Sequence, residues 1–362
     1  MTAARSAPAP ALAVVGATGA VGSIVLRLLS QRADVWGDIR LIASSRSAGR
    51  RLAVRTEEAE VLALTEDAFD GLGAGDVAIF LTPAEVSARW APVVTARGVV
   101  VVDQSAAFRE DPEVPLVVPE VNGHAARIRP RGIVAGPDSV TAAMIAALGA
   151  LHAEYALADL AVSTYQAASA AGRAGSEALR RQLSLVAGST LGEQPGDVRR
   201  AVGEDTGPFA APLALNVVPW SGELREGGWS SQELAVRAQT RRILDLAELP
   251  VAVTCVLVPV LAGHSMTVRA RFETEVDAGH AREILEGAPG VVLVDDPAAG
   301  EFPTPSDAAG TDPAWVGRLR ASLDDPRALE FFVSADNLCQ GSALNATQTA
   351  ELVAGEFAHF AL

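Results

Sequence analysis

A glycine-rich stretch near the start of the chain restricts the fold more than any other part of the sequence. The apolar run Ala11–Val15 predicts a buried strand, Gly16–Gly22 follows with the pattern G-x-x-G-x-x-G, and Ser23–Arg32 has the pattern of a helix. In this context the glycines allow a tight turn and let a pyrophosphate approach the helix N-terminus. We therefore interpret the stretch as a dinucleotide-binding turn rather than a purely structural one.

The residues that follow continue this alternation of strands and helices. Ile39–Ala43, Val77–Leu81 and Val99–Val102 are short apolar runs that predict strands, and Ala84–Thr95 has the pattern of a helix. Such alternation predicts an α/β fold with a Rossmann-type, doubly wound parallel sheet. The length of 362 residues leaves room for a second domain after this one.

The loop after the second predicted strand indicates which dinucleotide is bound. An NAD-selective site usually has an acidic residue near this place, where it binds the ribose 2′-hydroxyl. This loop instead contains Ser45, Arg46 and Ser47. Hydroxyls and an arginine suit a 2′-phosphate, so the sequence favours NADP. The alternative interpretation is a solvated surface loop without a role in binding.

Composition argues against several classes of function. The net charge of −15 argues against nucleic acid as a partner. No apolar run reaches the roughly 18 residues that a membrane-spanning helix needs, and Met1–Pro10 lacks the pattern of a signal peptide. We therefore expect a cytoplasmic protein. Two cysteines do not make a disulfide framework, and Asp295-Asp296 has no further ligand spacing, so no metal site is expected.

A second turn, Gly136–Thr141, has the position of a catalytic loop. It follows the apolar run Gly132–Ala135 and precedes a helical stretch, Ala142–Leu148. A helix N-terminus offers unpaired backbone N–H groups and a positive dipole end, and enzymes place nucleophiles and oxyanion donors there. Arg109 follows the carboxyl end of another predicted strand, where ligands gather in such folds, and is a candidate for binding an anion.

Taken in order, stretches along nearly the whole chain resemble the aspartate-semialdehyde dehydrogenase family. The matching segments are Gly16–Gly22, Ser45–Gly49, Ser105–Arg109, Val114–Asn122, Thr164–Gly172, Asn216–Pro219, Thr254–Ser265 and Asp336–Asn345. The resemblance implies a Rossmann domain over residues 1–137 and a second α/β domain with a mixed sheet, for dimerisation and catalysis, over 138–340. Residues 341–362 are then a helix that returns to the first domain. Family members are homodimers or tetramers that bind NADP and reduce β-aspartyl phosphate to the semialdehyde, and we expect a homodimer here.

The resemblance also assigns cofactor contacts. They fall on Gly16, Thr18, Gly19, Ala20, Val21, Gly22, Ser45, Arg46, Ser47, Thr82 and Asn337. The family's Gly-Gly-Ser beside the cofactor phosphates is replaced by Pro83-Ala84-Glu85. A carboxylate at Glu85 opposes a pyrophosphate, so this replacement is unfavourable for tight binding.

The turn Pro137–Thr141 matches the family's nucleophile turn place by place, but with different chemistry. Ser139 stands where the family has its nucleophilic cysteine, and Asp138 stands where it has a neutral amide. A thiol has a pKa of about 8.5 that is easily lowered, whereas a serine hydroxyl is far less acidic. A carboxylate at Asp138 opposes a developing oxyanion. In this pair the chain resembles a paralogous branch of the family that has Asp-Ser instead of Asn-Cys.

Other family positions are partly kept. Gln166 matches the residue that orients the substrate carbonyl, His264 the acid/base histidine, and Arg109 a phosphate-binding arginine. Leu257 replaces the arginine that clamps the substrate's α-carboxylate, and leucine cannot make that bidentate pair. The position of a family glutamate reads Gln232, or Glu233 if the alignment moves by one residue.

These observations leave three hypotheses about function. In the first, the chain is an NADP-binding dimer that keeps the family fold and is impaired in the family reaction. In the second, it is an active NADP-dependent aldehyde or acyl-phosphate oxidoreductase of amino-acid biosynthesis on a modified substrate, for which Leu257 forms an apolar subsite. In the third, Ser139 and His264 form a pair for acyl transfer or hydrolysis.

The C-terminal third carries two further structural predictions. The run Phe331-Phe332-Val333 predicts an edge strand, and Asp336–Asn345 opens a final helix that runs to about Phe360. Residues 187–207 are rich in glycine and charge, and they predict a loop or a short helix over the second domain.

Overall fold

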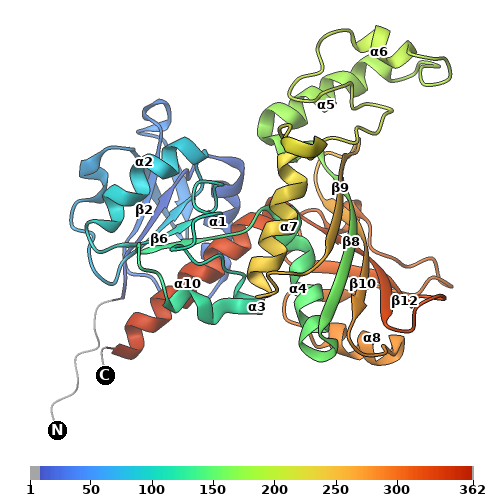
Figure 1. The fold of residues 1–362 in the computed structure, drawn as a ribbon. Coiled ribbons are helices and arrows are strands. Elements are labelled where there is room, and N and C mark those ends of the chain that lie inside the picture. Colours follow the sequence, from blue (N-terminus) through green and yellow to red (C-terminus); the bar gives the residue numbers. More distant parts are fainter. Residues whose placement is uncertain (1–8, 361–362) are drawn as a thin grey trace. The chain divides into compact units, whose positions relative to one another are not determined.

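The computed structural model describes residues 9–360, which form two compact units (Figure 1). Of the described residues, those up to Asp138 and those from Ser342 onwards make up the first unit, and Ser139–Gly341 makes up the second. Within the described residues, no helix combines the length and the apolar character needed to cross a membrane. Most of the segment Met1–Pro10, on which the signal-peptide prediction depends, lies outside them.

The first unit is built on a twisted sheet. In its described part the strand order is β3-β4-β2-β1-β5-β6-β7. The strands are β1 (Leu12–Val15), β2 (Ile39–Ala43), β3 (Arg51–Val54), β4 (Glu57–Ala63), β5 (Val77–Phe80), β6 (Val100–Asp103) and β7 (Ile133–Ala135). Neighbouring strands are parallel except β3, which is antiparallel to β4. The predicted doubly wound parallel sheet is confirmed, with one antiparallel strand at its edge.

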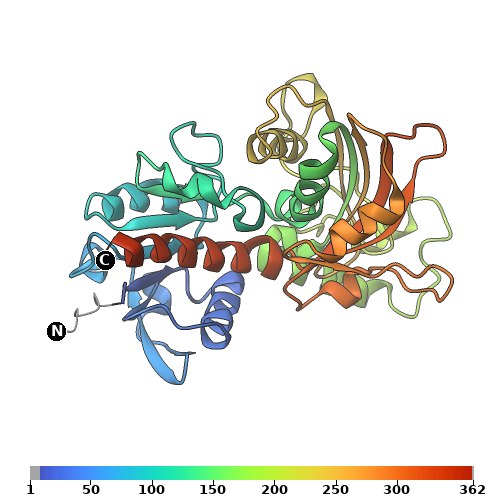
Figure 2. The ribbon, with the colours of Figure 1, turned by 90° about the horizontal axis from the view of Figure 1, so that it is seen from below.

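Helices cover this first sheet on its faces and follow its strands. They are α1 (Ala20–Gln31), α2 (Ala84–Thr95), α3 (Pro119–Asn122) and α10 (Asn345–Phe360), with short 3₁₀ turns at η1 (Ser45–Ser47), η2 (Glu66–Phe69) and η3 (Gly123–Arg127). Helix α10, red in Figure 2, belongs to this unit although it ends the chain. Its residues Ala346, Ala350 and Val353 share one apolar core with strand residues such as Leu12 and Val14.

The second unit contains a mixed sheet. Its described strand order is β11-β12-β13-β10-β8-β9. The strands are β8 (Leu157–Gln166), β9 (Val251–Leu257), β10 (His264–Phe272), β11 (Val291–Leu293), β12 (Ala314–Ala321) and β13 (Ala328–Ala335). The prediction of an edge strand at Phe331–Val333 is wrong, because β13 lies between β12 and β10. Phe331 and Val333 are buried and Phe332 is half-buried, so the short apolar run does not reveal which strands are its neighbours.

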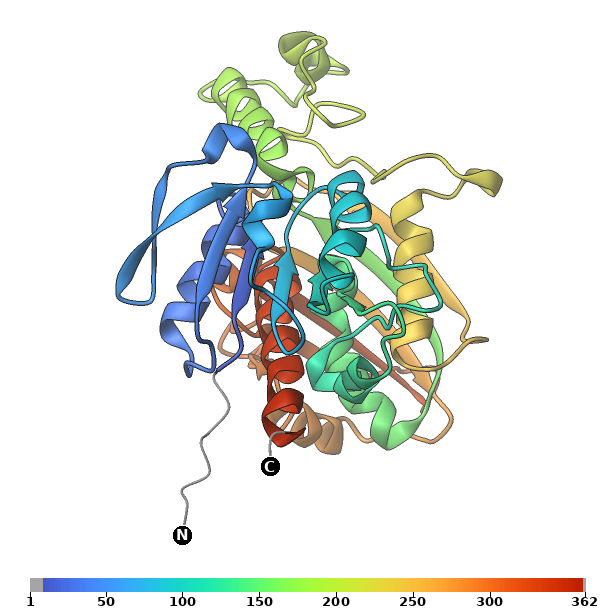
Figure 3. The same cartoon turned by 90° about the vertical axis from the view of Figure 1, so that its left-hand side faces the viewer.

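The helices of the second unit vary in how deeply they are buried. They are α4 (Ser139–Tyr155), α5 (Gly172–Val186), α6 (Asp197–Val202), α7 (Ser231–Ile243), α8 (Ala278–Glu286) and α9 (Pro305–Ala308), with 3₁₀ turns η4 (Ala168–Ala171) and η5 (Glu226–Gly228) and a π-helix, η6 (Cys339–Leu344). From Val140 to Leu148 every residue of α4 is buried, so this helix forms the centre of the unit. Figure 3 shows α5 and α6 at one end of the unit, with α6 as the short helix inside the glycine-rich segment.

Candidate active site

The turn between β7 and α4 places Ser139 at the first position of a long helix. Ser139 is half-buried, and it lies at the positive end of the α4 dipole. The helix begins three residues before the stretch that the apolar pattern indicates. The predicted strand, turn and helix are therefore confirmed, and a catalytic role of Ser139 at the start of the helix stays a prediction.

His264 faces this serine. It is the first residue of β10 and is fully buried, and its Nε2 lies 3.3 Å from Oγ of Ser139. The backbone N–H of Ala167 donates a hydrogen bond to Nδ1 at 3.2 Å. Burial lowers the pKa of His264 from 6.5 to about 3. The imidazole at this site is therefore neutral at physiological pH.

Gln166 ends the strand β8 beside them and is almost fully buried. Its Nε2 donates to Oγ1 of Thr164 at 3.1 Å, and its Oε1 accepts from the hydroxyl of Ser221 at 3.0 Å. Two hydroxyls thus fix the orientation of the amide. The sequence gives no indication that Ser221 belongs to the site, because only the folded chain brings it next to Gln166.

Leu257 lies directly opposite Gln166, in the parallel register of β8 and β9. Its side chain belongs to a small apolar cluster that includes Leu179, Leu213 and Val218. Its backbone exchanges two hydrogen bonds with Val218, at 2.8 and 3.0 Å. The position that the resemblance assigns to a carboxylate clamp is therefore apolar and packed.

The π-helix η6 approaches Ser139 closely. A Cβ atom placed on Gly341 would lie 2.7 Å from the Cβ of Ser139, closer than such atoms come in proteins. Just before it, Oδ1 of Asn337 accepts hydrogen bonds from the Ser169 hydroxyl at 3.0 Å and from the Gly263 N–H at 3.1 Å. Asn337 thus ties together the two loops on either side of His264. Its cofactor contact stays a prediction.

Arg109 braces the backbone in front of the reactive turn. Its Nε donates to the carbonyl of Gly136 at 2.9 Å, and a terminal nitrogen donates to the carbonyl of Gln104 at 2.6 Å. Burial lowers the pKa of Arg109, while the negative charges of Asp138 and Asp103 oppose that shift. The guanidinium already holds this turn and lies in the field of two carboxylates. Phosphate binding by Arg109 stays a prediction.

Glu233 caps a helix. Its Oε2 accepts the backbone N–H of Ser230 at 2.9 Å, and its backbone N–H is bound by the Ser230 hydroxyl, which makes a capping box at α7. Its other oxygen, Oε1, accepts the backbone N–H of Cys255 at 3.2 Å. Both carboxylate oxygens have a structural task in this position, and a substrate contact by Glu233 stays a prediction.

The glycine turn of the first unit is packed closely against neighbouring backbone. Gly16 has φ +94°, and a Cβ on it would lie 2.4 Å from the carbonyl oxygen of Leu81. A Cβ on Gly22 would lie 2.3 Å from the carbonyl oxygen of Gly16. Gly19 is the N-cap of α1, so no side chain caps the first N–H groups, and Ala20 and Val21 open the helix. These groups would hold the phosphates of a dinucleotide.

The region beside the turn has hydroxyl and cationic groups. Oγ1 of Thr18 donates to Oγ of Ser47 at 3.3 Å, and Ser45 and Arg46 are exposed in η1. A hollow of about 470 Å³ beside Thr18 is also lined by Arg27 and Arg50. The sequence alone did not identify Arg27 and Arg50 as candidates for cofactor binding. The only candidate arginine was Arg46, which lies in the loop directly after the second strand.

The loop after β5 departs from a phosphate site. Oγ1 of Thr82 pairs with Oγ of Ser87 at 2.9 Å, and Pro83 is the N-cap of α2. Glu85 is exposed in the first turn of α2, where its carboxylate interacts favourably with the helix dipole. That charge stabilises the helix but disfavours an anion at the same N-terminus.

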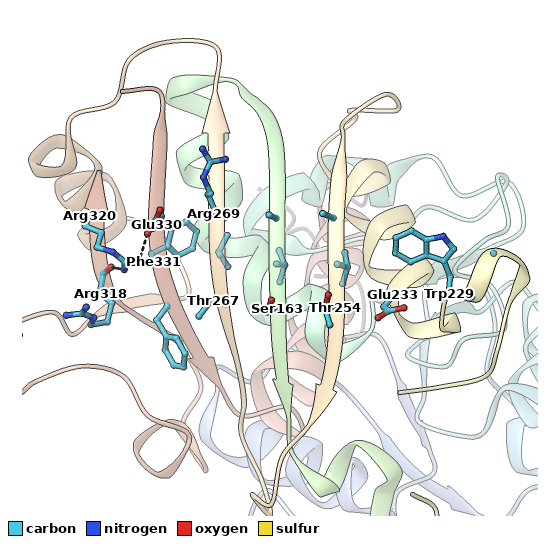
Figure 4. A pocket seen from close by; sticks show the side chains of 18 residues that line it. Ser163, Trp229, Glu233, Thr254, Thr267, Arg269, Arg318, Arg320, Glu330 and Phe331 are labelled. Carbon is cyan, nitrogen blue, oxygen red and sulfur yellow. Dashed lines mark hydrogen bonds and ion pairs between the residues drawn. The ribbon is translucent and has the colours of Figure 1, made fainter. Parts of the chain in front are cut away.

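A hollow of the second unit lies on the face of its sheet turned away from His264. Its volume is about 910 Å³. Figure 4 shows Ser163, Thr254 and Thr267 in its centre. Arg269, Arg318, Arg320 and Glu330 lie at one end, and Trp229 and Glu233 lie at the other. His264 and Thr267 are three positions apart on β10, so their side chains point to opposite faces.

The ionisable side chains of the described residues include no group of three or more His, Cys, Asp or Glu residues placed to hold a metal ion. Cys255 and Cys339 are buried free thiols, and the thiol of Cys339 donates to Oδ1 of Asp312 at 3.1 Å. The second unit therefore presents hydroxyl, imidazole and amide groups around the start of α4.

Comparison with known proteins gives matches over both units. The model of the family domain described as "Semialdehyde dehydrogenase, NAD binding domain" matches residues 11–128, and "Semialdehyde dehydrogenase, dimerisation domain" matches residues 148–340. Aspartate-semialdehyde dehydrogenase of Corynebacterium glutamicum is 42% identical over 346 residues, which cover 94% of this chain and 98% of that protein. The Bacillus subtilis enzyme of the same name is 35% identical over 341 residues, covering 94% and 96%.

Solved structures agree with these matches. Aspartate semialdehyde dehydrogenase II from Vibrio cholerae, in complex with ASA, has a TM-score of 0.87 and 32% identity, covering 97% of this chain and 100% of that one. Aspartate semialdehyde dehydrogenase with NADP from Candida albicans has a TM-score of 0.68 and 21% identity, covering 95% and 98%, and shows a shared fold.

Proposed function

We propose that this chain, which belongs to the aspartate-semialdehyde dehydrogenase family, is a homodimeric NADP-binding member that is impaired in phosphate-dependent oxidation of aspartate semialdehyde. The observation that carries the proposal is the hydroxyl of Ser139 at the head of α4, within 3.3 Å of His264. The family places a thiol at this position. A fold persists when the chemistry of its site changes, so family membership alone does not fix the reaction.

The oxidation depends on what stands at position 139. A thiolate adds to the aldehyde carbon, the resulting hemithioacetal gives a hydride to the nicotinamide, and phosphate cleaves the thioester. A thiol is readily ionised at a helix N-terminus, whereas a serine hydroxyl needs a general base to become a nucleophile. Asp138 adds a carboxylate next to the reacting atom in the sequence. Both differences oppose the first step.

Substrate binding is also changed. Leu257 packs in an apolar cluster opposite Gln166, where an arginine would bind a carboxylate in two places. Burying an unpaired carboxylate against apolar side chains costs on the order of several kcal/mol. The α-carboxylate of aspartate semialdehyde therefore has no equivalent anchor at Leu257.

Cofactor binding is supported by the first unit. No side chain fits at Gly16 or Gly22, as a tight dinucleotide-binding turn requires, and α1 begins without an acidic residue in its first turn. Arg46 in η1, with Arg27 and Arg50 beside Thr18, favours a 2′-phosphate and hence NADP over NAD. Calorimetric titration with both dinucleotides tests this preference. NAD affinity equal to or stronger than NADP affinity would contradict it.

Dimer formation is supported by the exposed face of the second sheet. A two-fold axis through its hydroxyl-rich centre would bring the cationic end, with Arg318 and Arg320, against Trp229 of a second copy. Thr267→Arg at the centre of this face is expected to give a monomer, because the new charge meets its own symmetry mate. Thr65→Arg on the first unit is the matched control. A wild-type monomer in light scattering at micromolar concentration would rule out the dimer.

A second candidate function is NADP-dependent oxidation or reduction of an aldehyde or acyl phosphate without a free α-carboxylate. The apolar cluster around Leu257, next to the oriented amide of Gln166, favours it. A screen of small aldehydes and acyl phosphates tests it. Turnover of apolar aldehydes, with no turnover of aspartate semialdehyde, is the expected signature.

NADPH formation from NADP, aspartate semialdehyde and phosphate tests the main proposal. Wild type is expected to show absent or very weak turnover, and Ser139→Ala should not lower it further. Robust wild-type turnover that Ser139→Ala removes would make Ser139 a nucleophile. Robust turnover that survives Ser139→Ala would show hydride transfer without a covalent intermediate.

A further inference from the structure

We propose that His264 is a fixed, neutral hydrogen-bond donor, and that the pair Ser139–His264 binds a carbonyl oxygen instead of making Ser139 a nucleophile. This role rests on the proposed function only in placing the reaction site at Ser139. It differs from the acid/base role that the family resemblance implies, and from a Ser–His pair for hydrolysis. The tautomer of the His264 imidazole can be measured without any enzymatic turnover.

The first support is the hydrogen bond that His264 receives. A neutral imidazole has one N–H donor and one acceptor nitrogen. The backbone N–H of Ala167 donates to Nδ1, so Nδ1 is the acceptor. The hydrogen must then be on Nε2, which faces Oγ of Ser139 at 3.3 Å. His264 therefore donates to the serine, and the serine accepts.

This arrangement is the reverse of a serine nucleophile with its base. There the histidine gives its Nδ1–H to a carboxylate and keeps Nε2 as the acceptor for the serine proton. For His264 to accept that proton at Nε2, Nδ1 would have to carry its own hydrogen. That hydrogen would oppose the Ala167 N–H, and a buried hydrogen bond would be lost.

Burial acts in the same direction as this hydrogen bond. His264 is fully buried, and desolvation lowers its pKa. Nearby ionisable groups of the packed elements are otherwise engaged. The carboxylate of Asp336 accepts three backbone N–H groups, including that of Cys339, whose thiol donates to Asp312. On α4, His152, Glu154 and Tyr155 lie at the far end, about 20 Å along the helix. Tyr165 lies opposite Ser265 in the register of β8 and β10, and both belong to the face of the sheet away from His264.

The ligand that fits is an uncharged carbonyl oxygen. The Ser139 hydroxyl, which accepts from His264 Nε2–H, keeps its own hydrogen to donate to a ligand, and the positive end of the α4 dipole lies at the same place. Asp138 precedes Ser139, and its negative charge disfavours a carboxylate there. Neutral imidazoles serve as electrophiles toward carbonyl oxygens in other enzymes. Gly341 completes the arrangement, because only a residue without a side chain fits against Ser139.

Nitrogen NMR of the full chain, labelled with ¹⁵N at histidine, tests the tautomer directly. The signals of His264 are assigned by their loss in His264→Gln. If His264→Gln does not fold, they are assigned by their shift in Ser139→Ala. We expect the Nε2–H tautomer and no titration between pH 5 and 8. An Nδ1–H tautomer, or a midpoint inside this range, would overturn the proposal.

A second measurement uses thiol chemistry at position 139. In Ser139→Cys, the pH dependence of iodoacetamide alkylation should show one transition below the ordinary thiol pKa of about 8.5. Adding His264→Gln keeps a donor and should leave this midpoint nearly unchanged, whereas adding His264→Leu should raise it. Two transitions, or equal shifts in both double variants, would contradict a fixed donor. The wild type, with Cys255 and Cys339, provides the background rate.

These results are independent of the proposed function. Loss of the Nε2–H tautomer would refute the role of His264 even if NADPH formation is absent. Conversely, robust NADPH formation would refute the proposed function whatever the tautomer of His264 is.

Discussion

Two turns of this molecule invite comparison, since each follows a parallel strand and opens a helix. The turn after β1 has two glycines, Gly16 and Gly22, where no side chain fits, and a helix start without a side-chain cap, as our proposal of dinucleotide binding requires. The turn after β7 likewise opens a helix, but in our proposal its Ser139 and Asp138 stand where the family reaction uses other groups. Binding a phosphate depends on backbone N–H groups and space, which many sequences supply. The oxidation depends on the identity of one atom, so it is lost more easily.

The largest expected effect comes from rebuilding the second turn. Ser139→Cys alone should not restore normal oxidation of aspartate semialdehyde, because the carboxylate of Asp138 holds the thiol pKa higher than a neutral residue at this position would, and Leu257 provides no clamp. Misplacement of a substrate alone costs on the order of 10²-fold. The triple variant with Asp138→Asn and Leu257→Arg should therefore exceed the single variant by about that factor or more in kcat/KM.

NADPH formation by the single, double and triple variants measures this difference. NADP affinity, measured in parallel, is the control that each variant is folded. Full activity in Ser139→Cys alone would show that the second turn differs from the family by its nucleophile only.

The next effect concerns the first turn. Gly16→Ala is expected to cost about 3 kcal/mol of stability, because its φ of +94° and the nearby Leu81 carbonyl both oppose a side chain. Gly49→Ala is the matched control. It has φ +80° but nothing within 4 Å of a new Cβ, so about 1 kcal/mol is expected. Urea unfolding of both variants compares them, and equal losses would show that space at Gly16 does not matter.

The buried histidine of the second unit should make stability depend on pH. Its folded-state pKa of about 3 lies below the ordinary 6.5, so the unfolded state binds more protons between these values. Stability contributed by neutral His264 is present above pH 6.5 and is lost as the pH falls toward 3. Between pH 6.5 and 5 the loss is about 2 kcal/mol. His264→Gln should flatten this part of the profile, and an unchanged slope would contradict the burial argument.

The smallest expected effect concerns the preference of the turn after β1 for NADP over NAD. Arg46→Ala should weaken NADP binding about tenfold, or about 1.4 kcal/mol, by removing one charge near the 2′-phosphate. NAD binding should be unchanged, since NAD lacks that phosphate. Arg51→Ala, an exposed arginine in β3 paired with Glu58, is the control. Equal losses for NAD and NADP would show that Arg46 acts on the fold or on the shared part of the dinucleotide.

The two turns also differ in how well the sequence predicts them. The parallel sheet and the glycine turn follow from local patterns, and β2 and α2 have the predicted bounds. The strand at Phe331–Val333 was misplaced at an edge, because a short apolar run does not reveal its neighbours.

Around Ser139 the decisive contacts join residues that are far apart in the chain. The Ala167 N–H that fixes His264, the Ser221 hydroxyl that holds Gln166 and the approach of Gly341 have no local pattern. Motif matching therefore identifies Ser139, His264 and Gln166 as candidates, but the tautomer of His264 becomes apparent only in the folded structure.

Our central claim is that the protein binds NADP but does not oxidise aspartate semialdehyde. A single-turnover experiment tests it most directly. Wild-type protein in excess, with NADP bound as shown by calorimetry on the same sample, is mixed with aspartate semialdehyde and phosphate, and NADPH absorbance is followed. We predict that NADP binds and that no NADPH appears on the time scale on which a cysteine-containing relative completes the reaction. NADPH in an amount equal to the added aldehyde, lost in Ser139→Ala, would contradict this account.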